Sequence, residues 1–154
     1  MPGVMMYPDA KHKNSLRVGE NYQEKIKRVI FEQFGYVIDY YKTKREQYEI
    51  GESRQGFEIK YDSQIMKYGH LSIEIAEKSR IDIPFWTDSG IFREDNTKWY
   101  VQGDDNTAWI FGKVDLIKYY NDNKPKIYES FGTVRKFYLD IDVADKLAKK
   151  IIKL

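Results

Sequence analysis

Acidic and basic side chains alternate with apolar ones in residues 56–62, and this segment of the chain is the best suited to chemistry. Glu58, Lys60 and Asp62 occupy every second position within it. Alternate side chains of a β-strand point to opposite faces, so we expect these three on one face and the intervening apolar side chains on the other. The segment therefore predicts a strand that presents two carboxylates and one ammonium group together.

A second alternating segment, residues 71–75, carries Glu74. The chain between the two segments is long enough to turn back, so we expect Glu74 on a neighbouring strand, close to Glu58 and Asp62. Like charges held close together repel unless a cation lies among them. Mg²⁺ is a hard ion that prefers carboxylate oxygens, and Mn²⁺ is an alternative. The sequence therefore predicts a metal site formed by Glu58, Asp62 and Glu74.

This set of side chains fits the hydrolysis of a phosphodiester bond. That reaction uses a metal ion to activate water and positive charge to stabilise the phosphorane. The three carboxylates would hold the ion, and Lys60 would supply the charge. The same alternation is also typical of a solvated sheet face on which Glu58 and Lys60 form cross-strand ion pairs, and this interpretation stays open.

Three short motifs resemble the nuclease domains of the PD-(D/E)XK superfamily, in particular its resolvase-like and phage-borne branches. They are the E-x-K-x-D pattern in residues 56–62, the glutamate-bearing residues 71–78, and the Asp-Ser-Gly-Ile of residues 88–91. The resemblance covers about residues 21–111. It implies a restriction-endonuclease-like fold and a magnesium-dependent endonuclease that acts on DNA.

The resemblance also implies roles for individual residues. It carries the E-x-K pair onto Glu58 and Lys60, with Asp62 and Glu74 as additional acids. It further implies a fourth catalytic acid on the first helix of the domain, and Glu24 is the position that fits. A capping role at the start of that helix would explain Glu24 equally well.

One departure from the family pattern concerns the acid that precedes the E-x-K motif. The superfamily usually places a Pro-Asp pair or a lone acid on the preceding strand. No Pro-Asp pair precedes Glu58, which leaves Asp39, Glu49 or Glu52 for that position.

A second register of the motif is equally compatible with the sequence. In it, Asp62 is the lone acid and Glu74 begins the E-x-K pattern. Ala76 then stands where the lysine is expected, so Lys60 or Lys78 would have to supply the positive charge. Both registers keep Asp62 and Glu74 close to the metal.

Composition limits the classes of function. Lys and Arg number 26 and Asp and Glu 24, and the net charge of +2 permits DNA as a partner without indicating it. The absence of cysteine excludes disulfides, thiolate zinc sites and cysteine nucleophiles. No apolar stretch is long enough to span a membrane, and residues 1–16 lack the apolar region of a secretory signal. We therefore expect a cytoplasmic protein that binds DNA and no membrane, with a homodimer as one arrangement for cutting two strands.

Hydrophobic periodicity predicts a single domain over residues 20–154, preceded by an irregular arm over residues 1–19. The expected helices are residues 21–34, 114–120, and a C-terminal segment that starts at 140 or 142 and continues to about Ile151. The expected strands are residues 36–41, 56–62, 71–75 and 134–139, with a further short one at 48–50. Residues 95–111 are expected to form a hairpin in which each Asp-Asn-Thr, at 95–97 and 105–107, makes the turn before a β-rich run. A central mixed sheet flanked by helices gives the α+β class, or α/β with a mixed sheet.

A non-catalytic DNA- or protein-binding module, descended from the same fold and associated with a phage or mobile element, is the alternative function. The arrangement of the acids distinguishes the two. Carboxylates within reach of one ion favour the enzyme, whereas carboxylates paired off as salt bridges favour the binding module.

Overall fold

The computed structural model describes residues 10–154, with side chains from Leu16 onward, as two compact units that divide after Val37. The N-terminal unit contains one helix, α1 (Ala10–Phe34), which Gly35 ends with a φ of 71°. We expected this helix to begin at Asn21, but residues 10–19 are helical and not irregular. This stretch contains no proline, and a single glycine inside a helix costs only about 1 kcal/mol.

Residues 1–9 of the expected arm lie outside the described residues. The single domain that we predicted over residues 20–154 stays a prediction, because it crosses the division between the two units.

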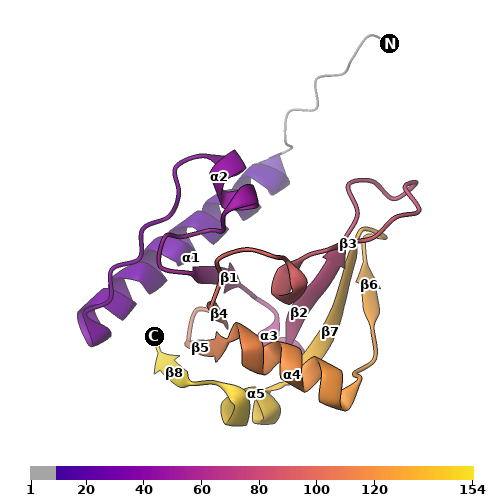
Figure 1. Ribbon diagram of the computed structural model, residues 1–154. Helices are drawn as coiled ribbons and strands as arrows, with labels where there is room; N and C mark the ends of the chain where they lie inside the picture. Colours follow the sequence, from indigo (N-terminus) through magenta and orange to yellow (C-terminus); the bar gives the residue numbers. More distant parts are fainter. Residues whose placement is uncertain (1–9) are drawn as a thin grey trace. The chain divides into compact units, whose positions relative to one another are not determined.

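The C-terminal unit, Ile38–Leu154, contains a mixed four-stranded sheet (Figure 1). Its strands, in spatial order, are β1 (Phe57–Tyr61), β4 (Trp99–Gly103), β5 (Thr107–Gly112) and β8 (Lys150–Lys153). β1 runs parallel to β4, and the other pairs are antiparallel. The β4–β5 hairpin confirms the prediction for residues 95–111. Its turn is held by Asp104, whose Oδ1 accepts hydrogen bonds from the main-chain N–H groups of Asn106 and Thr107, both at 2.9 Å.

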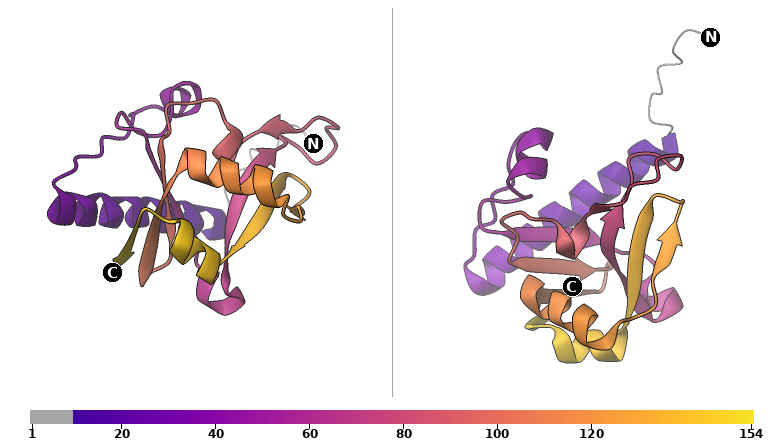
Figure 2. Two further views of the ribbon diagram at one scale, coloured as in Figure 1. Left: turned by 60° about the horizontal axis from the view of Figure 1, so that its bottom comes forward. Right: turned by 45° about the vertical axis from the view of Figure 1, so that its right-hand side comes forward.

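A second, antiparallel sheet has four strands that run side by side (Figure 2). They are, in spatial order, β3 (Thr87–Asp88), β2 (His70–Glu77), β7 (Val134–Asp140) and β6 (Tyr128–Ser130). The predicted strands at 71–75 and 134–139 are confirmed as β2 and β7.

Short helices connect and cover these strands. They are α2 (Lys44–Glu49), α3 (Ile65–Tyr68), the 3₁₀ turn η1 (Gly90–Phe92), α4 (Lys113–Asn123) and α5 (Ile141–Leu147). The class is therefore α+β, as predicted, with a mixed sheet and a second sheet that we did not anticipate. Within the part of the chain that the structure describes, no helix combines the length and apolar character needed to cross a bilayer.

One hydrophobic core joins both sheets of this unit. Among its members with no exposed surface are Leu71 and Phe137 of the second sheet, Phe111 of the first, and Leu116 of α4. On β2 and β7 the core residues occupy one face, since Leu71 pairs with Leu139 and Ile73 with Phe137. The alternate residues of both strands, including Glu74, lie on the other face.

Three predicted elements are wrong. Residues 36–41 form no strand beyond an isolated bridge between Tyr40 and Ser53. Residues 44–49 are helical and not extended, because Thr43 and Glu46 form a capping box that starts α2. The C-terminal helix ends at Leu147, and Lys150–Lys153 form β8, which buries Ile152 along the edge of β5.

Candidate functional site

Glu58 and Lys60 lie on the same face of β1, opposite Tyr100 and Gln102 of the parallel strand β4. Glu58 is only 4% exposed, so this face is not a solvated one at that position. Its Oε1 lies 3.3 Å from Nζ of Lys60, whose side chain is 45% exposed. A buried carboxylate requires a partner charge, and Lys60 supplies it.

The ammonium group of Lys60 is surrounded by carboxylates. Desolvation lowers its pKa, but the negative charges of Glu58, Glu74 and Glu52 outweigh that effect and raise the pKa above its usual value of 10.5. Lys60 is therefore positively charged at neutral pH. The contribution of Glu74 indicates that residues from the two sheets act on the same charge.

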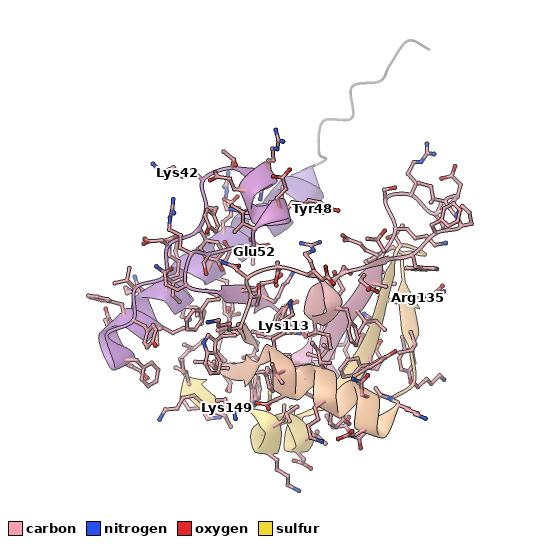
Figure 3. The ribbon with its side chains drawn as sticks, in the orientation of Figure 1. Lys42, Tyr48, Glu52, Lys113, Arg135 and Lys149 are labelled. Atoms are coloured by element: carbon pink, nitrogen blue, oxygen red, sulfur yellow. The ribbon has the colours of Figure 1, made fainter. Side chains whose placement is uncertain are left out.

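Glu52 belongs to the same electrostatic cluster and lies between α2 and β1 (Figure 3). The pKa of Glu52 is raised overall, first by burial and then by the negative charge of Glu58. The positive charge of Lys60 opposes this shift only in part. Of the three acids considered for the position before E-x-K, Glu52 is the one that interacts with this pair. Glu49 pairs with Arg45 at 3.0 Å, and Asp39 accepts a hydrogen bond from Gln55 at 3.4 Å.

Asp62 connects the first sheet to β2. Its Oδ2 accepts hydrogen bonds from the main-chain N–H of Ser72, at 3.1 Å, and from Nε2 of Gln102, at 2.9 Å. The same Nε2 donates to the main-chain carbonyl of Ser72 at 2.7 Å. These bonds satisfy the main chain of β2 at Ser72, where β3 does not extend to pair with it.

Our expectation that Glu58 and Glu74 lie on neighbouring strands of one sheet is wrong, because β1 and β2 belong to different sheets. The connection between them contains α3, whose Ile65 is fully buried in the core. This helical turn directs β2 away from β1. The two strands share no main-chain pairing, and side-chain hydrogen bonds that involve Asp62 and Gln102 connect them instead.

The position of Glu74 is fixed by a close contact with Gly90. Gly90 adopts a φ of +56°, and a Cβ atom there would lie 2.0 Å from the carbonyl oxygen of Glu74. The hydroxyl of Tyr100 donates a hydrogen bond to the carbonyl of Gly90. Burial, together with the negative charge of Glu58, raises the pKa of Tyr100, so this hydroxyl keeps its proton.

We expect Gly90→Ala to destabilise the protein by at least about 2 kcal/mol, since it adds a main-chain clash to the cost of a left-handed alanine. Gly69→Ala is the matched control, because Gly69 has a φ of +77° but no atom within 4 Å of the position that a Cβ would take, so it bears the backbone cost alone. Urea unfolding of both variants measures the difference. Equal losses of stability would show that the contact with Glu74 is not tight.

A cavity of about 370 Å³ brings several of the predicted site residues together. Lys60, Asp62 and Glu74 all line it, together with Lys136, which lies opposite Glu74 in the register of β2 and β7. Glu58 does not line the cavity but contacts Lys60. The cavity therefore contains two carboxylates and two lysines from different sheets.

Two other residues predicted for the site, Lys78 and Glu24, do not line the cavity. Lys78 does not line this cavity, and its Nζ lies 4.6 Å from the ring centre of Trp86. The register that begins at Glu74 would therefore have to use Lys60. Glu24 belongs to the N-terminal unit, where it pairs with Lys27 at 3.0 Å, and its catalytic role stays a prediction.

The cavity offers two carboxylates, those of Asp62 and Glu74, as oxygen ligands. Within residues 16–154, no group of three or more histidine, aspartate or glutamate side chains is arranged to hold a metal ion. Mg²⁺ usually takes one or two protein carboxylates and completes its shell with water and substrate phosphates. Asp62 and Glu74 would fit that requirement, whereas the buried Glu58 is engaged by Lys60.

Sequence reasoning missed several residues of the site. Gln102, Tyr100 and Gly90 support it through tertiary contacts that no local pattern indicates. Lys136 had no specific signal either, because the Lys-x-Tyr spacing of residues 136–138 also occurs at residues 98–100, 118–120 and 126–128. Comparisons of the chain with protein-family models, curated proteins and solved structures found no match.

Proposed function

We propose that this protein is a metal-dependent DNA nuclease, a divergent member of the PD-(D/E)XK superfamily with a restriction-endonuclease-like fold. One observation carries the proposal: Lys60, Asp62 and Glu74, which the motif resemblance singles out, line one cavity although they come from two sheets. A charged lysine and two carboxylates in one cavity are groups that can support metal-dependent phosphodiester hydrolysis.

Each residue has a role in this proposal. Asp62 and Glu74 would hold Mg²⁺ or Mn²⁺, which when bound supplies a Lewis acid next to the phosphate. Lys60 would contact a non-bridging phosphate oxygen and stabilise the charge that develops there. Glu58 would orient Lys60 through their ion pair, and Lys136 would bind a second phosphate oxygen or the adjacent phosphate.

The non-catalytic binding module is the second candidate, and two observations favour it. Glu58 is paired off with Lys60, and Asp62 already accepts two hydrogen bonds that stabilise β2. A module of this kind would use Lys60 and Lys136 to bind phosphates without cutting them. Cytoplasmic location and a homodimer stay predictions for either candidate.

The experiment that separates the candidates is a digest of duplex, single-stranded and branched DNA by the purified protein. We expect products in Mg²⁺ or Mn²⁺ and none in a chelator. Binding of DNA without products in either metal, at protein in excess over DNA, would contradict the nuclease and favour the binding module.

A further inference from the structure

Four aromatic rings form a continuous row across the outer face of the second sheet. Tyr128 of β6 lies 4.4 Å from Tyr138 of β7, measured between ring centres. Tyr138 stacks on His70 of β2 at 3.8 Å, with 26° between the ring planes. His70 in turn lies 6.0 Å from Tyr68 of α3, at 17°. We call these four residues the aromatic row.

A lysine ammonium group lies near three of the four rings. Lys126 lies 5.0 Å from the ring centre of Tyr128, Lys136 lies 5.4 Å from that of Tyr138, and Lys67 lies 5.2 Å from that of Tyr68; these are the three lysines of the row. On β7, the Lys-x-Tyr spacing places Lys136 on the same face as Tyr138, whereas Lys126 precedes the first residue of β6 by two positions.

The aromatic row lies on the face of the sheet opposite the hydrophobic core. Phe137 and Leu139, which alternate with the row residues on β7, have no exposed surface and pack into the core. Tyr68, at one end of the row, is 58% exposed, and the other three rings are half-buried. Because Tyr138 lies between His70 and Tyr128, neighbouring rings cover parts of one another's faces, and Tyr68 is the ring of the row most open to solvent.

The aromatic row leads directly into the candidate site. Tyr68, His70 and Tyr138 line the same cavity as Asp62 and Glu74. A strand of nucleic acid bound along the row would therefore contact residues that line the cavity.

Cross-strand aromatic pairs stabilise sheets, and this effect accounts for the contact between Tyr128 and Tyr138. It does not account for the lysine beside each of three rings, or for the continuation of the row through His70 to the exposed Tyr68. Aromatic platforms flanked by cations are the means by which proteins bind single-stranded nucleic acid. Bases stack on the rings, and the lysines follow the phosphates.

We propose that the aromatic row binds the unpaired bases of single-stranded DNA and directs that strand to the cavity. The substrate class is therefore DNA with a single-stranded or unwound segment. Cleavage of that strand rests on the proposed function, whereas its binding does not.

Binding is measured by the fluorescence anisotropy of a labelled oligothymidylate of about twenty nucleotides, in a chelator so that no cleavage occurs. We compare it with an abasic oligonucleotide of equal length, which has the same phosphates and no bases. We expect the wild-type protein to bind the abasic strand at least about tenfold more weakly. Equal affinities would overturn the proposal, because phosphate contacts alone would then explain the binding.

Two double variants test the rings themselves. Tyr68→Leu/Tyr138→Leu removes stacking and keeps apolar bulk, and we expect it to bind oligothymidylate at least about tenfold more weakly than wild type. Tyr68→Phe/Tyr138→Phe keeps the aromatic faces and should bind within about twofold of wild type. Equal affinities of the two variants would overturn the proposal, and the abasic comparison needs no variant at all.

The outcomes also separate this inference from the proposed function. Base-dependent binding without cleavage in Mg²⁺ would support the aromatic row and contradict the nuclease. Cleavage in Mg²⁺ without base-dependent binding would support the nuclease and overturn the aromatic row.

Discussion

Replacing Lys60 by methionine is expected to slow DNA cleavage at least about a hundredfold while changing DNA affinity only slightly. The ammonium group would act on the charge that develops as the phosphate is attacked, so its loss raises the activation barrier more than it weakens binding of the ground state. Single-turnover rates and chelator-treated binding assays measure the two effects separately.

Two controls keep this prediction specific. Lys118→Met removes an exposed lysine that pairs with Asp122 on α4, and it should leave the cleavage rate unchanged. Lys60→Met also leaves the buried Glu58 without its partner, so it should lower stability, and adding Glu58→Gln should restore stability without restoring cleavage. Recovery of cleavage in that double variant would show that Lys60 acts only by holding the fold.

Replacing Glu74 by glutamine is expected to reduce cleavage to at most about a hundredth of the wild-type rate, because it removes one of the two carboxylates that line the cavity. The amide has almost the same shape, so the main-chain contact with Gly90 is kept. A second readout is thermal: Mg²⁺ should raise the melting temperature of the wild type and raise that of Glu74→Gln less, since bound ligand stabilises the folded state.

Glu129→Gln is the matched control for this substitution. It makes the same chemical change at an exposed glutamate of the same sheet, which pairs with Arg135 at 3.2 Å. Arg135 is labelled in Figure 3. Its cleavage rate and its response to Mg²⁺ should match the wild type. Loss of cleavage in both variants would mean that the effect of Glu74→Gln is not local to the cavity.

The strands that carry the candidate residues could be predicted because their patterns are local. Period-two alternation identified β1 and β2, and an Asp-Asn-Thr turn before each β-rich run identified the β4–β5 hairpin. The end of α1 was equally local, because Gly35 adopts the left-handed conformation that ends a helix. Its beginning was not predicted, because Gly19 was interpreted as a break, although Asp9, a residue type common at helix N-termini, directly precedes Ala10.

The pairing of the strands could not be predicted, because it depends on contacts far apart in the sequence. Ile65 in the core and the bonds that Asp62 and Gln102 make to Ser72 decide that β2 leaves the first sheet. The same holds for β8, whose residues continue a helical pattern until pairing with β5 is taken into account. Tertiary context overrides local periodicity in both cases.

The candidate site was predictable in part, because residue types are local information whereas burial and strand register are not. The residue types at 58, 60, 62 and 74 led to the proposed chemistry, which stays a prediction, and three of the four residues line one cavity. The burial of Glu58 and its role as the partner of Lys60 follow from the register of β1 against β4, which the sequence alone does not reveal.

The central claim is that Asp62 and Glu74 act together at a metal-dependent cleavage site. Its most direct test is the cleavage rate of single-stranded DNA in excess Mg²⁺ for the wild type and for Asp62→Asn/Glu74→Gln, with the folding of both verified by circular dichroism. We expect product from the wild type and none from the folded double variant. Cleavage by that variant at the wild-type rate would contradict the assignment of the site, and the absence of product from the wild type would contradict the nuclease itself.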